Sequence, residues 1–89
     1  MAAKHVIFIG RVQGVGFRYT AHRIAYRYRL AGFVRNLPDG TVEMLAQGPP
    51  QDIDDCIQDI KEYFGDYLRE TRVQEMPTDP KYKDFRITF

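Results

Sequence analysis

Apolar residues recur along the chain with two different periods, one typical of strands and one typical of helices. Residues 4–12, KHVIFIGRV, are β-branched or aromatic at consecutive positions, which favours a strand in the middle of a sheet over a strand at its edge. GFVRNL and TVEMLAQ flank the tripeptide PDG at residues 38–40, where proline, aspartate and glycine favour a tight turn. The two flanking stretches are therefore predicted to form a hairpin.

Two further stretches repeat apolar side chains at helical spacing, which places each set on one face of a helix. The first set comprises Phe17, Ala21, Ile24 and Tyr28, and the second comprises Ile53, Ile57, Ile60 and Phe64. The first helix is expected to end near Gly32; the second is expected to start after the GPP of residues 48–50 and to end near Gly65. Cys56 lies beside the second apolar stripe and is predicted to be a buried thiol.

The segment after Gly65 holds two strand candidates: ETRVQEM, which is the weaker, and KDFRITF, which alternates well. The predicted order of elements is β, α, β, β, α, β. Helices that each carry one apolar stripe indicate a two-layer α+β sandwich, so we predict a ferredoxin-like fold with an antiparallel sheet and both helices on one face. This architecture hosts enzymes, RNA binders and metal carriers, so it does not by itself define a function.

The composition is that of one globular domain, taken as residues 1–89. Of the 89 residues, 44% are hydrophobic and 28% are charged, which excludes a disordered chain. The longest uninterrupted aliphatic or aromatic run is VIFI, too short to span a membrane, and no segment resembles a signal peptide. With a single cysteine, no internal disulfide can form. Without a membrane span or a signal peptide, the expected location is the cytoplasm. The expected form is a monomer.

The net charge of +1 conceals an asymmetry between two parts of the chain. Residues 1–36 carry a charge of +7 without one acidic side chain, whereas residues 37–89 carry a charge of −6. A basic segment is typical of chains that bind phosphate, nucleic acid or a membrane surface, and equally of a helix whose basic face is only solvated. Charge alone leaves both interpretations open.

The stretch GRVQGVGFR, residues 10–18, joins the first predicted strand to the first predicted helix. Its glycines at positions 10, 14 and 16 would let consecutive backbone N–H groups surround an anion at the positive end of the helix. Arg18 would then donate to two phosphate oxygens at once. The alternative is a tight connection with a surface arginine, and the stretch matches neither a Walker A nor a dinucleotide-binding sequence.

Asn36 ends the strand that enters the predicted hairpin. Its carboxamide can both donate and accept hydrogen bonds, so it could hold a water molecule at a set angle, although it cannot take up a proton as a base. Asparagine is also common at turns, which is the alternative explanation. Neither GRVQGVGFR nor the segment around Asn36 indicates one function by itself, but the two together do.

Together, GRVQGVGFR and GFVRNLPDGTVEMLAQG resemble the two signature segments of the acylphosphatase family. The resemblance extends over almost the whole chain, including the ending FRITF, and is loose only between residues 62 and 80. It implies that Arg18 and Asn36 are the catalytic residues. It also implies that Gly10 and Gly40 shape the loops and that no metal or other cofactor takes part. The implied phosphate-binding residues are Gln13, Gly14, Val15, Gly16, Phe17 and Arg18.

The implied reaction is the hydrolysis of a small acyl phosphate to a carboxylate and inorganic phosphate. The carboxylate leaving group has a conjugate acid with a pKa of about 4, so it departs with little help from a general acid. Asn36 would orient the water, whose proton would pass to a phosphate oxygen of the substrate, because neither Asn36 nor Arg18 can accept it. The expected partners are the acyl phosphate and inorganic phosphate, the latter as product and competitive inhibitor, with no nucleic acid and no membrane.

Three alternatives differ in kind. An RNA-binding module shares the predicted fold, but the third-strand candidate TVEMLAQG holds no aromatic residue on which a base could stack. An inactive phosphate sensor and the acylphosphatase-like piece of a larger carbamoyl-transfer enzyme also fit, although the short chain and single cysteine disfavour the larger enzyme. His5 and His22 lack companion ligands at metal spacing, and His22 would at most border the site.

Overall fold

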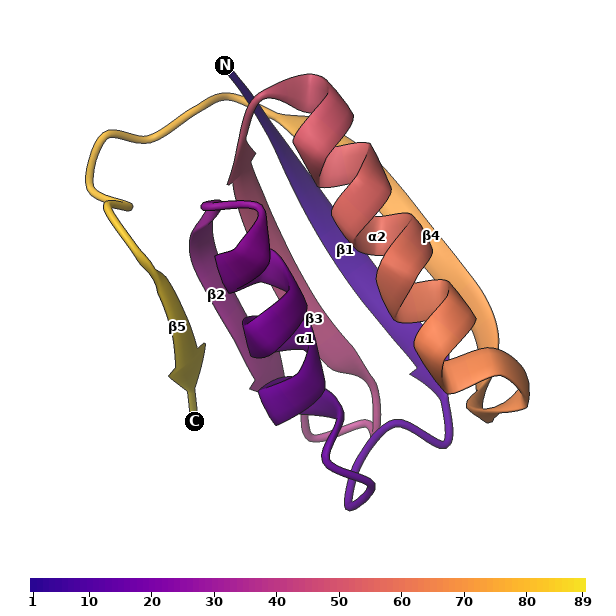
Figure 1. Cartoon of the computed structure of the whole chain (residues 1–89). Helices are drawn as coiled ribbons and strands as arrows, with labels where there is room; N and C mark the ends of the chain where they lie inside the picture. The colour runs from indigo at the N-terminus through magenta and orange to yellow at the C-terminus, as the bar shows by residue number, and fades with distance from the viewer.

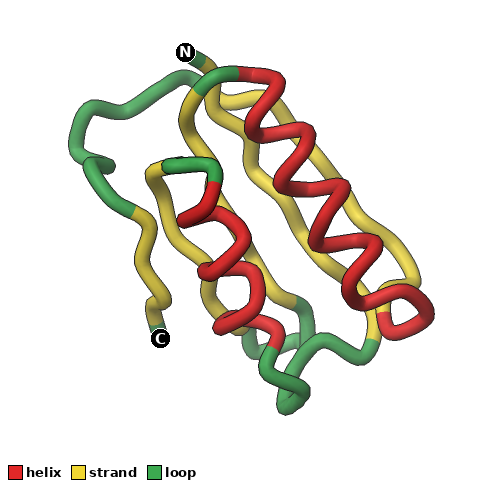
Figure 2. The backbone as a smooth tube through the Cα atoms, viewed as in Figure 1, coloured by secondary structure: helices red, strands yellow, loops and turns green.

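The computed structural model describes all 89 residues and consists of a five-stranded sheet with two α-helices on one of its faces (Figure 1). The elements are β1 (Ala2–Gly10), α1 (Phe17–Arg27), β2 (Ala31–Asn36), β3 (Val42–Gly48), α2 (Pro50–Phe64), a short 3-10 helix η1 (Gly65–Tyr67), β4 (Leu68–Met76) and β5 (Phe85–Thr88). Figure 2 shows the helices in front of the sheet, with the loops at the ends of the strands. No helix has both the length and the apolar character needed to cross a membrane.

The strands follow the order β4-β1-β3-β2-β5 across the sheet. β1 pairs antiparallel with β3 and β4, which confirms the predicted position of the first strand inside the sheet. β2 and β3 form the predicted hairpin, with Asn36 opposite Val42. Two details of the prediction are wrong: both candidates after Gly65 are strands, and β5 runs parallel to β2, so the sheet is mixed rather than wholly antiparallel.

The parallel pairing of β5 follows from the path of residues 77–84. This segment leaves the end of β4 at one edge of the sheet and passes the end of β3, where the Gln47 side chain accepts a hydrogen bond from the Asp79 N–H at 2.8 Å and donates one to its carbonyl at 3.0 Å. The chain therefore reaches the other edge beside the start of β2. A strand that starts there must run in the same direction as β2.

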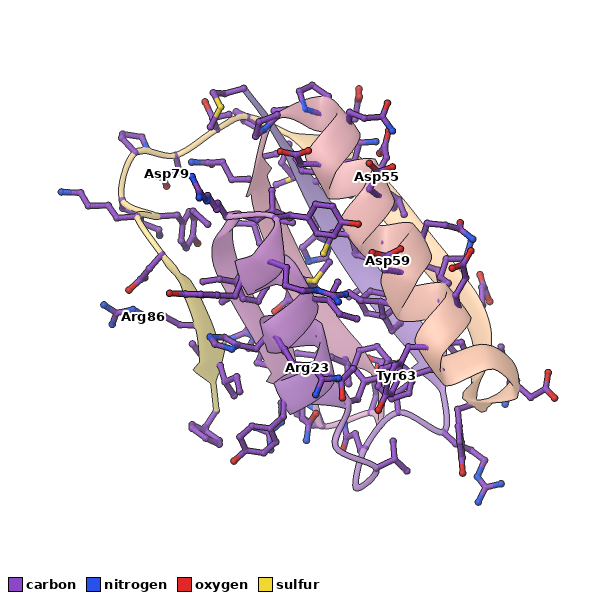
Figure 3. All side chains as sticks on the ribbon, in the orientation of Figure 1. Arg23, Asp55, Asp59, Tyr63, Asp79 and Arg86 are labelled. Atoms are coloured by element: carbon purple, nitrogen blue, oxygen red, sulfur yellow. The ribbon has the colours of Figure 1, made fainter.

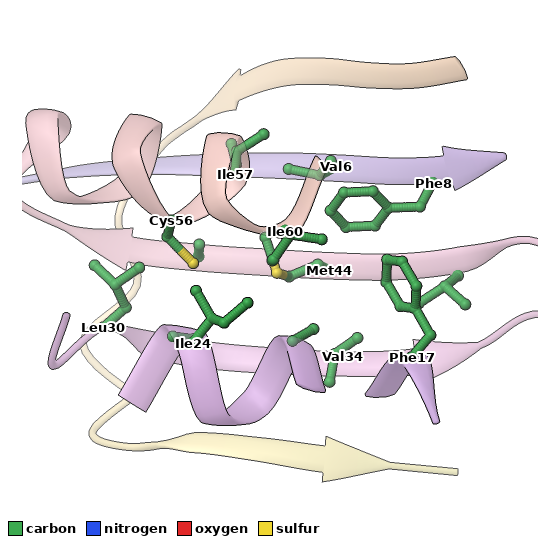
Figure 4. Packing of buried hydrophobic residues seen from close by; sticks show 14 of the residues in the cluster. Val6, Phe8, Phe17, Ile24, Leu30, Val34, Met44, Cys56, Ile57 and Ile60 are labelled. Carbon is green, nitrogen blue, oxygen red and sulfur yellow. The ribbon is translucent and has the colours of Figure 1, made fainter. Parts of the chain in front are cut away.

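The core lies between the helices and the sheet (Figure 4). It contains both predicted apolar stripes except Tyr28, which is half-buried, packs against the core and follows the end of α1. Cys56 is fully buried in it, as predicted. Phe17, the first residue of α1, packs its ring against Phe8 of β1 and Phe64 of α2, with centroid distances of 4.9 and 4.3 Å. These contacts anchor the start of α1, and with it the glycine-containing loop.

The ends of α2 were predicted correctly, whereas the end of α1 was not. α2 begins at Pro50 and ends at Phe64 with Gly65 as its C-cap, as predicted. α1 ends at Arg27, well before the predicted stop near Gly32. The chain leaves the helix through Arg29, a non-glycine residue with a positive φ of 55°, and Gly32 lies inside β2. The apolar stripe could not reveal this end, because a left-handed arginine has no sequence signature.

Candidate active site

The loop of residues 11–16 connects β1 to α1 and lies against the turn of residues 37–41 between β2 and β3, at the lower end of the molecule in Figure 1. The Gln13 side chain bridges the two segments, because its Nε2 donates to the carbonyl oxygens of Leu37 at 2.8 Å and Thr41 at 2.9 Å. The two stretches singled out in the sequence are therefore adjacent in space.

The loop backbone bends at its glycines and leaves its N–H groups free. Gly14 and Gly16 have left-handed φ values of 77° and 75°, and Gly16 is the N-cap of α1 without any capping side chain. Backbone N–H groups from Val12 to Tyr19 donate no hydrogen bond within the protein; the first that does belongs to Thr20, which donates to the Gly16 carbonyl at 3.1 Å. These N–H groups are available to an anion at the positive end of the helix.

A pocket of about 180 Å³ opens beside this loop. Its lining residues are Val12, Gly14, Gly16, Phe17, Arg18, Tyr19 and Asn36. The pocket thus brings the two predicted catalytic residues together, whereas Gln13 and Val15 do not line it. Sequence reasoning missed Tyr19, an exposed side chain whose position directly after Arg18 was the available signal.

Asn36, the last residue of β2, lines the pocket, and its side-chain oxygen Oδ1 is buried. Its Oδ1 accepts no hydrogen bond from any group of the protein. Buried polar oxygens are normally hydrogen-bonded, so an exception calls for an explanation. The residue lines the pocket, whereas no group of the protein satisfies this oxygen.

Arg18 lies in the first turn of α1 and is half-buried. Its Nη1 donates a long hydrogen bond of 3.5 Å to the Thr88 carbonyl, and its guanidinium lies 4.9 Å from the centre of the Phe89 ring. None of the ion pairs in the protein includes Arg18. Its positive charge is therefore not neutralised by a carboxylate, and it remains able to bind an anion.

Gly10 and Gly40 lie at the borders of the two site segments. Gly10 ends β1, and the N–H of the next residue, Arg11, donates to the Tyr67 carbonyl at 2.8 Å. Gly40 lies in the turn after Asn36, where its N–H donates to the Leu37 carbonyl at 3.1 Å. Each glycine thus lies next to one of the hydrogen bonds that hold these segments in place.

Both histidines lie outside the pocket. The Nε2 of His22 is 2.9 Å from the Phe85 carbonyl oxygen, so α1 is linked to β5, and the Nε2 of His5 is 2.8 Å from a carboxylate oxygen of Glu43. No group of three or more His, Cys, Asp or Glu side chains is arranged to hold a metal ion. The polar groups at the pocket are backbone amides, a guanidinium and a carboxamide.

The fold is a small α+β sandwich of the ferredoxin-like class, and the free amides of its first strand-to-helix loop and its unpaired arginine are groups that can bind an anion. The comparison with known families is more specific. The family model for acylphosphatase matches residues 4–87, so the chain belongs to the acylphosphatase family. The resemblance of the two signature segments is thereby confirmed, and so is the enzyme class, a hydrolase that acts on small acyl phosphates.

Individual relatives agree with this assignment. The acylphosphatase of Chlorobaculum tepidum is 42% identical over 86 residues, covering 93% of this chain and 91% of the relative. The crystal structure of acylphosphatase from Bacillus subtilis is similar over 100% of both chains, with 34% identity and a TM-score of 0.93. Full-length HypF, in its phosphate- and nucleotide-bound form, matches 99% of this chain at 32% identity with a TM-score of 0.85, but the match covers 12% of HypF.

Proposed function

We propose that the pocket beside residues 11–16 is the active site, in which Arg18 and the loop amides hold the phosphoryl group and Asn36 orients the attacking water. The observation that carries this proposal is the meeting of Arg18 and Asn36 at one small pocket, where the Oδ1 of Asn36 has no hydrogen-bond partner in the protein. A fixed acceptor can take a hydrogen bond from a water molecule and direct the lone pair of that water toward phosphorus.

Phosphoryl transfer depends mainly on positioning and on neutralising the charge of the equatorial phosphate oxygens. The proposed phosphate-binding residues are those predicted from the sequence: Gln13, Gly14, Val15, Gly16, Phe17 and Arg18. Their free N–H groups and the uncompensated guanidinium supply partial and full positive charge where the phosphate would lie. Gly10 and Gly40 take part only by shaping the two segments.

The proposed reaction needs no proton acceptor from the protein. The water oxygen attacks phosphorus, the bond from phosphorus to the acyl oxygen breaks, and the electron pair of that bond leaves with the carboxylate. One proton of the water passes to a phosphate oxygen of the substrate, since neither an amide nor a guanidinium can accept it. The products are a carboxylate and inorganic phosphate, with all atoms accounted for.

Three finer expectations belong to this proposal. Inorganic phosphate binds the same amides and arginine as the substrate, and so inhibits competitively. We expect the active form to be a monomer. We expect the protein to be located in the cytoplasm.

The test is the hydrolysis of benzoyl phosphate in the presence of EDTA by the wild type, Arg18→Ala and Asn36→Ala. Loss of one such contact commonly lowers kcat about 10²- to 10³-fold. Both variants are expected to show this loss, but only Arg18→Ala should also weaken inhibition by inorganic phosphate strongly. Arg23→Ala is the matched control, because Arg23 is an exposed arginine of the same helix that does not line the pocket.

Two results would contradict the proposal. If Asn36→Ala weakened phosphate inhibition as much as Arg18→Ala, Asn36 would bind phosphate rather than orient water. A folded wild type without turnover would make the pocket an anion receptor instead of a catalytic site.

A further inference from the structure

The side chain of Gln13 points away from the pocket to which its loop belongs, and toward the turn that follows Asn36. We infer that Gln13 is a positioning residue, which fixes the placement of Asn36 relative to the phosphate-binding loop. The side chain of Gln13 therefore affects the step in which water is oriented, whereas only its backbone N–H belongs to the proposed phosphate-binding loop. This inference rests on the proposed function of Arg18 and Asn36.

The hydrogen bonds of Gln13 use its full donor capacity. A carboxamide NH₂ has two N–H donors, and here one is directed at the Leu37 carbonyl, 2.8 Å away, and one at the Thr41 carbonyl, 2.9 Å away. Each of these oxygens also accepts a bond within the turn, from the N–H of Gly40 and of Leu37 respectively. A carbonyl oxygen has two lone pairs, so Gln13 occupies the acceptor sites that the turn leaves free.

These two bonds hold both ends of the turn that follows Asn36. Leu37 directly follows Asn36, and Thr41 directly precedes Val42, the residue paired with Asn36 in the sheet. No other hydrogen bond joins residues 11–16 to residues 36–42. Because no hydrogen bond holds the Oδ1 of Asn36, its position depends on packing and on the placement of the backbone that carries it.

Hydrogen bonds within the turn hold its own shape. The Oδ1 of Asp39 accepts hydrogen bonds from the Thr41 hydroxyl at 2.6 Å and from the Thr41 N–H at 3.0 Å. These two bonds stabilise the charged carboxylate and therefore lower the pKa of Asp39. Gln13 therefore determines the placement of the whole turn rather than its internal shape.

The test compares Gln13→Met, which keeps the length of the side chain and removes its donors, with Gln74→Met. Gln74 is an exposed glutamine of β4, far from the pocket, and is the matched control. Because misplacement by about 1 Å costs on the order of 10²-fold in rate, Gln13→Met should lower kcat for benzoyl phosphate about 10- to 100-fold. The inhibition constant for inorganic phosphate should stay within about twofold of the wild-type value, since the loop amides and Arg18 are intact. Gln74→Met should leave both quantities unchanged.

A double-mutant cycle separates positioning from a general structural effect. Gln13→Met is expected to lower kcat no further in an Asn36→Ala background, because the two residues act through one step. An unchanged kcat in the single variant would overturn the inference. So would an equal further fall in the Asn36→Ala background, or a phosphate inhibition constant that rises in proportion to the loss of kcat.

A measurement without substrate separates this inference from the proposed function. The side-chain NH₂ signal of Asn36 in an ¹⁵N–¹H spectrum, assigned by its loss in Asn36→Ala, should shift in Gln13→Met and stay in place in Gln74→Met. If the wild type failed to hydrolyse benzoyl phosphate while this signal still responded, the proposed function would fail and the placement of Asn36 by Gln13 would stand. If the position of the Asn36 signal did not change in Gln13→Met, the inference would be overturned, whether or not the wild type hydrolyses benzoyl phosphate.

Discussion

Gly10 and Gly40 both bend the chain next to the proposed site, but only Gly10 is surrounded by other backbone. A Cβ at position 10, where φ is 145°, would lie 2.2 Å from the Tyr67 carbonyl oxygen. At Gly40, where φ is 91°, nothing lies within 4 Å of such an atom. The same residue type is thus required at one position by both space and backbone conformation, and at the other by backbone conformation alone.

Gly10→Ala is therefore expected to destabilise the protein more than Gly40→Ala. The left-handed conformation alone costs about 1 to 2 kcal/mol for a residue with a Cβ, which is the expected loss for Gly40→Ala. In Gly10→Ala the new Cβ must also displace the backbone of Tyr67, so the free energy of unfolding is expected to fall by about 3 kcal/mol or more. Urea unfolding followed by circular dichroism measures both, and equal losses would show that the approach of Tyr67 to Gly10 is not constrained.

At the scale of elements, α1 and α2 are joined along their polar sides as well as through the core. The Tyr28 hydroxyl donates a hydrogen bond to the Asp59 carboxylate of α2. One turn farther along, Arg23 of α1 lies over the ring of Tyr63, 5.8 Å from its centre (Figure 3). The hydrogen bond to Asp59, together with burial and the negative charge of Asp59, raises the pKa of Tyr28 to about 12.

This pKa makes the link between the helices sensitive to alkaline pH. The unfolded pKa of tyrosine is about 10, so the neutral hydroxyl stabilises the folded chain fully below that pH and loses its effect as the pH rises toward about 12. Tyr28→Phe should therefore lower the urea midpoint at pH 7, and the difference from the wild type should shrink by pH 11.

A second readout and a control belong to this prediction. Titration of phenolate absorbance should show one late-titrating tyrosine that Tyr28→Phe removes. Tyr26→Phe should leave both the midpoint and the late titration unchanged, because Tyr26 is 72% exposed. If the late titration persisted in Tyr28→Phe, the bond between Tyr28 and Asp59 would not form in solution.

At the scale of the whole molecule, Cys56 reports on the integrity of the core. Its thiol is fully buried, and burial raises its pKa to about 12, so both access and thiolate formation are suppressed in the folded chain. A thiol reagent at pH 8 should therefore modify Cys56 only when the core opens.

Removal of a neighbouring core side chain should expose this thiol more often. Ile60→Ala is expected to cost about 2 to 5 kcal/mol, which raises the labelling rate of Cys56 about 10-fold or more where opening is in rapid equilibrium. Inorganic phosphate should slow labelling of the wild type, because a ligand of the folded chain lowers the open population. Fast labelling of the unmutated protein at pH 8 would show that the core around α2 is loose.

Features that depend on neighbours along the chain could be predicted before the fold was known. The helical spacing of Ile53, Ile57 and Ile60 identified the buried face of α2, and the tripeptide PDG identified the turn of the hairpin. The glycine-containing loop and Asn36 were identified as site candidates because glycine, arginine and asparagine have distinctive chemistry. Spacing and residue type are local properties, so they can be read without knowing the fold.

Contacts between distant parts of the chain could not be predicted in this way, because they depend on the complete fold. Whether β5 runs parallel or antiparallel to β2 depends on the path of residues 77–84 around the end of the sheet, and no local pattern encodes that path. Two sets of hydrogen bonds join segments at least 24 residues apart: the bond of Arg18 to Thr88 and the two bonds from Gln13. The burial of the unpartnered oxygen of Asn36 depends on how such segments pack. A hydrogen bond needs its donor and acceptor within a fraction of an ångström, and the packing of the whole chain sets that distance.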